Sequence, residues 1–77
     1  MPPLRALHWR TVERVVLFLG YELYRTEGSH RIYIKEDEIK HVTVPKHKAI
    51  APGTLASIIR QMNIDRKRFL EIVEQIV

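Results

Sequence analysis

Three short segments rich in β-branched and aromatic residues follow one segment with helical periodicity and precede two further helical segments. This order limits the folds open to the chain. The three segments are residues 21–26, 30–35 and 40–44. Each has a composition typical of a β-strand. The order predicts an α+β domain of the form α-β-β-β-α with a further C-terminal helix, in which a three-stranded antiparallel sheet carries the helices on one face.

The helical segments are recognised by apolar side chains that recur every three or four residues. These stripes consist of Trp9, Val12, Val15, Val16 and Leu19 in the first helix, Leu55, Ile58, Ile59 and Met62 in the second, and Phe69, Ile72, Val73 and Ile76 in the third. Pro52 suits the first turn of the second helix, and Asp65 is expected to cap the third. Gly20 is expected to end the first helix, and Asn63 to end the second in a left-handed conformation.

Leu17 and Phe18 do not fit the stripe of the first helix. We expect them to cover a sheet edge or to contact the third helix. The alternative is that they form a docking spot for a partner protein.

Alternation along the second strand assigns its side chains to two faces. Ile32 and Ile34 share one face, and Arg31 and Tyr33 share the other. The isoleucine face is expected to pack against the helices. By the same alternation His30 would be buried there, unless its position at the start of the strand leaves it at the rim of the sheet.

Length and composition indicate one small domain. A chain of 77 residues buries only about 60% of its unfolded surface on folding, so residues 1–77 are expected to form a single domain, with residues 1–8 as a flexible leader. The absence of cysteine excludes disulfides and thiolate metal sites and is compatible with a reducing cytosol. The longest apolar run, Val15 to Leu19, is too short for a signal peptide or a membrane span. We therefore expect a cytoplasmic protein without a membrane partner.

The positive charge is concentrated in the second half of the chain. Between Lys40 and Arg68 there are seven basic residues and one acid, a balance of +6, which leaves −2 for the rest of the net +4. Such asymmetry is typical of a surface that faces phosphate, although solvated faces are often basic too.

A Gly28-Ser29-His30 triplet stands between the first two predicted strands. Gly28 is suited to the positive φ that a tight turn demands, and Ser29 to a hydrogen bond with nearby backbone. The two residues would then orient His30, and histidine is the usual proton-transfer residue near neutral pH. The alternative is an ordinary turn without chemistry.

Five motifs follow one another along the chain: Gly28-Ser29-His30, Val42-Thr43-Val44-Pro45, Lys46 to Lys48, Pro52-Gly53-Thr54-Leu55 and Ile58-Ile59-Arg60-Gln61. Taken in order, they resemble the HicA family of toxins, which are small messenger-RNA interferases of type II toxin–antitoxin systems. The similarity extends from about Arg10 to Val73. Ala49 and Ala51 depart from the pattern, since family members often have charged residues there.

The resemblance implies a double-stranded-RNA-binding-domain-like fold, ribonuclease activity through His30, and neutralisation by a HicB-type antitoxin. We predict that RNA contacts the protein at Ser29, Arg31, Lys46, Lys48 and Arg60. No metal site is expected, because the histidines are scattered and no carboxylate lies at ligand spacing from them. No cofactor is expected either.

The chemistry needs few protein groups, because RNA carries its own nucleophile, the 2′-hydroxyl. One histidine that removes a proton, with a few cations near the phosphate, would suffice for a slow enzyme. His41, His47 and Lys46 are candidates for the acid that protonates the leaving oxygen. Two alternatives remain. One is a non-catalytic double-stranded-RNA-binding module that grips phosphates with the helix start at Pro52-Gly53-Thr54 and the loop Lys46 to Lys48. The other is a protein-interaction domain built around Leu17 and Phe18.

Overall fold

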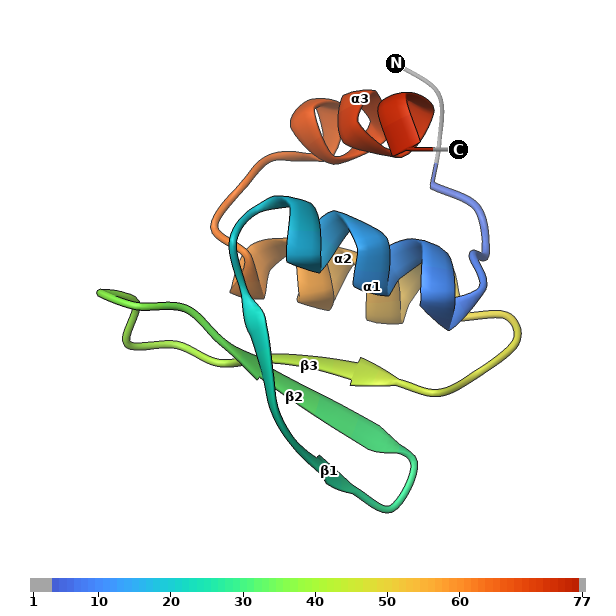
Figure 1. The fold of residues 1–77 in the computed structure, drawn as a ribbon. Coiled ribbons are helices and arrows are strands. Elements are labelled where there is room, and N and C mark those ends of the chain that lie inside the picture. Colours follow the sequence, from blue (N-terminus) through green and yellow to red (C-terminus); the bar gives the residue numbers. More distant parts are fainter. Residues whose placement is uncertain (1–3, 77) are drawn as a thin grey trace.

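The computed structural model describes residues 4–76 and confirms the predicted element order (Figure 1). The elements are α1 (Trp9–Phe18), β1 (Glu22–Glu27), β2 (His30–Ile34), β3 (Val42–Pro45), α2 (Pro52–Gln61) and α3 (Arg66–Ile76). The strand ends differ from the predicted ones by one or two residues. The predicted α+β class, with a three-stranded antiparallel sheet and the helices on one face, is confirmed.

The sheet has the order β1-β2-β3, so β2 is the central strand. Figure 1 shows α1 and α2 in a layer over the sheet, with α3 beyond them. All six residues of β1 are exposed, and a break in register between Leu23 and Arg25 bends this edge strand. The helices therefore cover the β3 side of the sheet more completely than the β1 side.

The face of β2 that packs against the helices is the opposite of the predicted one. Tyr33 is fully buried, whereas Ile32 and Ile34 are only partly buried. Val42 pairs with Tyr33 in the antiparallel ladder and is buried on the same face. The Ile32 face, which carries His30, is consequently the outer face of the sheet. The prediction failed because Tyr33 is as apolar in its ring as isoleucine and finds polar partners for its hydroxyl inside the helix layer.

The predicted helix ends are confirmed. Gly20 follows α1 with φ 95°, and Asn63 follows α2 with φ 58°, a left-handed conformation. Pro52 begins α2, and Asp65 caps α3 by accepting a hydrogen bond from Arg68 N–H through Oδ1 at 2.8 Å. Within residues 4–76, no helix has both the length and the apolar composition required to cross a membrane.

Leu17 and Phe18 are 47% and 50% exposed, so about half of each residue faces solvent, and their expected contact with a sheet edge or the third helix stays a prediction. The stripe residues of α1, not these two side chains, form its buried face toward the sheet and α3. The two side chains leave an apolar spot on the surface beside the end of α1.

The flexible leader predicted for residues 1–8 falls in part on residues 1–3, outside the described residues. From Leu4 onward the segment lies against the domain. Leu7 N–H donates to Ile50 O at 3.2 Å, and Ile50 N–H donates to Leu7 O at 2.7 Å. Leu4 and Leu7 also pack against the core.

Substitution of Phe69 is expected to reduce stability more than other substitutions in α3, because its side chain is fully buried. Phe69→Ala should lower the free energy of unfolding by about 3–5 kcal/mol, since the cavity it leaves lies between packed helices. Urea denaturation followed by circular dichroism measures this change. Glu71→Ala, at an exposed position of the same helix, is the control and should stay within about 0.5 kcal/mol of the unchanged protein. A cost below about 1 kcal/mol for Phe69→Ala would contradict the docking of α3 on the core.

Candidate active site and nucleic-acid interface

Three segments that are distant in the sequence meet at one end of the domain. Lys46 N–H donates to Ser29 O at 2.7 Å, which joins the segment after β3 to the turn between β1 and β2. Trp9 N–H donates to His47 O at 3.1 Å, which joins the same segment to the start of α1. We call this end the rim; it consists of residues 8–10, 28–30 and 45–48.

His30 is the first residue of β2 and is exposed. Gly28 has φ 57°, so the turn uses the conformation for which glycine is suited. His30 pairs with Glu27 on one side and Pro45 on the other, and these neighbours share its face of the sheet. The imidazole therefore belongs to the outer, solvent-facing side of the rim.

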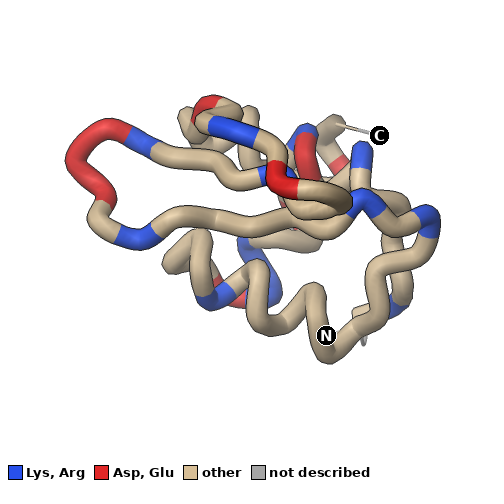
Figure 2. Tube along the Cα trace, turned by 90° about the horizontal axis from the view of Figure 1, so that it is seen from below, with Lys and Arg blue, Asp and Glu red and all other residues tan. Residues whose placement is uncertain are grey.

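The structure brings several of the predicted RNA-binding residues together at the rim. Lys46 and Lys48 are exposed, and Ser29 fixes the position of Lys46 through its backbone carbonyl. In Figure 2 the three-acid loop between β2 and β3 forms one tip, and several lysine and arginine positions occupy the opposite end of the sheet. This arrangement separates the basic rim from the acidic loop.

Arg31 also lies next to His30, but its charge is already paired. Arg31 Nε donates to Glu13 Oε2 and to the Tyr33 hydroxyl, both at 3.0 Å, and Nη2 lies 2.9 Å from the same Oε2. Tyr33 O–H donates to Glu13 Oε2 at 2.5 Å. We call these three side chains the Glu13 network. The Arg31 and Glu13 side chains are only 22% and 17% exposed, so the network ties α1 to β2 from the interior.

Burial raises the pKa of the Tyr33 phenol to about 12, and its hydrogen bond to Glu13 acts in the same direction. Both effects disfavour the phenolate, because burial removes its hydration and the carboxylate repels it. Tyr33 therefore stays a hydrogen-bond donor throughout the neutral range.

Sequence reasoning placed Trp9 only in an apolar stripe, but its ring also collects cations. Around it lie the guanidinium carbons of Arg10 and Arg31, at 4.9 and 5.3 Å from the ring centre, and Lys46 Nζ at 5.8 Å. No local pattern could have shown this, because Trp9, Arg31 and Lys46 come from separate elements. Glu13 was overlooked for the same reason.

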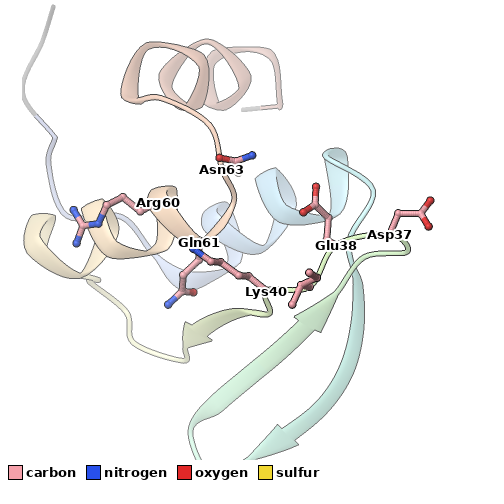
Figure 3. Close-up of a pocket in the computed structure, with 7 residues that line it drawn as sticks. Asp37, Glu38, Lys40, Arg60, Gln61 and Asn63 are labelled. Carbon is pink, nitrogen blue, oxygen red and sulfur yellow. The ribbon is translucent and has the colours of Figure 1, made fainter.

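Arg60 belongs to α2 and is drawn in Figure 3. It lines a cavity of about 290 Å³ between the β2–β3 loop and the end of α2. Its guanidinium turns back along α2, where Nη2 donates to Ser57 Oγ at 3.1 Å. The cavity that Arg60 lines lies beside the β2–β3 loop, at the end of β2, whereas His30 lies at the start of that strand. The structure therefore does not bring Arg60 together with His30.

The candidate acids are divided between the two ends of the sheet. Lys46 and His47 belong to the rim, whereas His41 precedes β3 at the other end and contacts the Tyr24 ring at a centroid distance of 6.3 Å. Among residues 4–76, no three histidine, aspartate or glutamate side chains gather closely enough to hold a metal ion.

The Tyr33 shift makes stability depend on pH in the alkaline range. The phenol has a higher pKa in the folded state, about 12, than in the unfolded chain, about 10, so its contribution is complete below pH 10 and is lost as the pH rises toward 12. Between about pH 9 and pH 12 the unchanged protein should lose about 2–3 kcal/mol more of its free energy of unfolding than Tyr33→Phe. Urea denaturation of both proteins at the two pH values measures the difference. Equal losses would show that the phenol is not held in the Glu13 network.

Comparison with known proteins gives one result that bears on the rim. A family model described as the HicA toxin of bacterial toxin–antitoxin systems matches residues 9–64, which is most of the chain and includes β1, β2, β3 and every rim residue except His8. The comparison with curated proteins found no match. The chain therefore belongs to the HicA toxin family and is the toxin of a system that also contains an antitoxin.

Proposed function

We propose that this toxin is a messenger-RNA interferase, an endoribonuclease in which His30 acts on RNA at the rim. The observation that carries the proposal is the placement of His30: it is exposed at the start of β2, directly after the residue whose carbonyl holds the lysine segment. Membership of the HicA family supports the proposal, because its toxins are generally ribonucleases.

The proposed reaction uses the 2′-hydroxyl of the RNA. His30, in its neutral form, takes the proton of this hydroxyl, and the oxygen attacks the adjacent phosphorus. The bond from phosphorus to the 5′ oxygen breaks, and that oxygen receives a proton. The products are a 2′,3′-cyclic phosphate and a free 5′-hydroxyl. A positioned general base contributes about 10²–10⁴-fold, which is enough for a toxin because each cut destroys a message.

Lys46 and Lys48 supply the charge that phosphate recognition needs. Both are exposed, and the backbone of Lys46 is hydrogen-bonded to Ser29 in the turn that carries His30. They attract the backbone and stabilise negative charge on the phosphoryl oxygens. Arg31 does not bind phosphate in this proposal, because its charge is neutralised by Glu13; it helps to hold β2 against α1 instead. His47 and Lys46 are the better-placed candidates for the acid.

The proposed partners are messenger RNA and a HicB-type antitoxin. Family membership supports an antitoxin partner, and the resemblance extends this to the HicB type. A substrate of this kind places the protein in the cytoplasm. Neither a cofactor nor a metal has a part in the proposed reaction, since the RNA supplies the nucleophile and the protein side chains supply the proton transfers.

His30→Ala tests the proposal directly. We expect single-turnover RNA cleavage to fall by at least about 10²-fold, because the general base is lost, while the free energy of unfolding stays within about 1 kcal/mol, because His30 is exposed. Gel analysis of a labelled RNA measures the cleavage. His41→Ala is the matched control: it removes an exposed histidine at the far end of the sheet and should cleave like the unchanged protein.

Two outcomes would contradict the proposal. Cleavage by His30→Ala at the unchanged rate would move catalysis to another residue. RNA binding without cleavage by the unchanged protein would favour the non-catalytic RNA-binding module.

A further inference from the structure

We infer that the cations gathered on Trp9 form a phosphate-binding site for the RNA strand, on the helix side of the rim; this inference rests on the proposed function. The site consists of the Trp9 indole with Arg10 and Lys46. Cations over an indole face are attracted by the negative charge of the ring face. Their side chains are therefore partly ordered before RNA arrives, which lowers the entropy cost of binding.

Arg31 anchors the ring in this site. Its guanidinium carbon lies 5.3 Å from the indole centre, and the same guanidinium is held by Glu13 and Tyr33. Tyr33 is fully buried, so the contacts lead from the core to the ring. Trp9 is itself partly buried and packs against the core. The ring is thus a fixed surface on which the two outer cations rest.

Arg10 and Lys46 keep their charge available. Both are exposed, and among residues 4–76 neither forms an ion pair. Three cations and one carboxylate, Glu13, leave the cluster with a balance of +2. The first backbone donors of α1 are already occupied, since Trp9 N–H donates to His47 O and Arg10 N–H donates to His8 Nδ1 at 3.1 Å. Binding therefore depends on the side chains and not on the end of the helix.

The position of the cluster connects it to His30. Arg31 follows His30 in β2, and successive side chains of a strand point to opposite faces. Lys46 is held to Ser29, the residue before His30. A strand of RNA whose phosphate reaches His30 on the outer face can thus place a neighbouring phosphate on Arg10 and Lys46. An acidic protein segment is the competing ligand, but only a nucleic acid must also reach His30 under the proposed function.

Binding of a 2′-O-methyl RNA of about 12 nucleotides, which lacks the nucleophile, tests the inference. Fluorescence anisotropy of the labelled oligonucleotide gives Kd between about 50 and 200 mM salt. Arg10→Gln with Lys46→Gln should weaken binding about tenfold or more and lower the log–log salt slope by about 0.7, because the two side chains share one phosphate and each single-strand phosphate contact adds about 0.7. Arg66→Gln with Lys67→Gln removes the same charge from exposed positions at the start of α3 and should leave the slope unchanged.

Substitution of the ring separates its positioning role from charge. Trp9→Leu should raise Kd about fivefold and keep the salt slope, because the cations remain but are no longer held. Trp9 contacts the core, so circular dichroism must first show that the variant is folded; Trp9→Phe keeps a ring and should have a smaller effect in the same direction. Trp9 is the only tryptophan, so a change of its emission on adding RNA to the unchanged protein is expected as well.

Three results would contradict the inference. If the Arg10 and Lys46 double variant keeps the full salt slope while the unchanged protein still cleaves RNA, the cluster does not bind the substrate and Lys46 has no part in phosphate recognition, but the proposed catalysis by His30 stands. If polyglutamate of equal length binds the cluster as tightly as the oligonucleotide, the site is a protein-docking surface. If the unchanged protein neither binds nor cleaves RNA, the proposed function itself is wrong.

Discussion

The carboxylate of Glu13 lies between α1 and β2 and accepts hydrogen bonds from both Arg31 and Tyr33. A fully buried tyrosine needs a partner for its hydroxyl, and a largely buried guanidinium needs a counter-charge. Glu13 meets both needs with one oxygen. This network fixes which face of β2 turns toward the helices, and the alternation along the strand then places His30 on the other face.

The rim depends on this interaction. The Glu13 network holds the middle of α1 against β2, and the hydrogen bond from Trp9 to His47 connects the start of this helix to the segment after β3. The bond from Lys46 to Ser29 closes the connection beside His30. In the proposed account, chemistry takes place on the outer side of the rim, while the cations on Trp9 hold the substrate on the helix side. The two tasks are divided between faces of a domain too small for a deep pocket.

Much of the fold could be predicted because it depends on local patterns. The stripes of the three helices, the left-handed Asn63 and the Asp65 cap each follow from neighbouring residues, and the structure confirms them. The buried face of β2 could not be predicted in the same way. Ile32 and Ile34 look more apolar than Arg31 and Tyr33, and only the distant Glu13 makes burial of the second pair favourable.

The site shows the same limit. His30 and the lysines after β3 stand in recognisable motifs, whereas the cluster on Trp9 is formed by residues from α1, β2 and the segment after β3. Arg60 was predicted from its charge and its place in the Ile58-Ile59-Arg60-Gln61 motif, and neither says where α2 places its side chain relative to the rim. Leu17 and Phe18 stood outside the stripe of α1, but the pattern could not decide between contact with α3 and an open surface, since that depends on where α3 docks.

The central claim is that the rim cleaves RNA through the substrate's own 2′-hydroxyl, and the products of a single-turnover reaction test it most directly. An RNA oligonucleotide and its all-deoxy counterpart of the same sequence are incubated with the unchanged protein, and the ends of the fragments are identified by mass spectrometry. Only the RNA should be cut, and its fragments should carry 2′,3′-cyclic phosphate and 5′-hydroxyl ends while the deoxy strand stays intact. Cleavage of the deoxy strand, or fragments with 5′-phosphate ends, would contradict the claim.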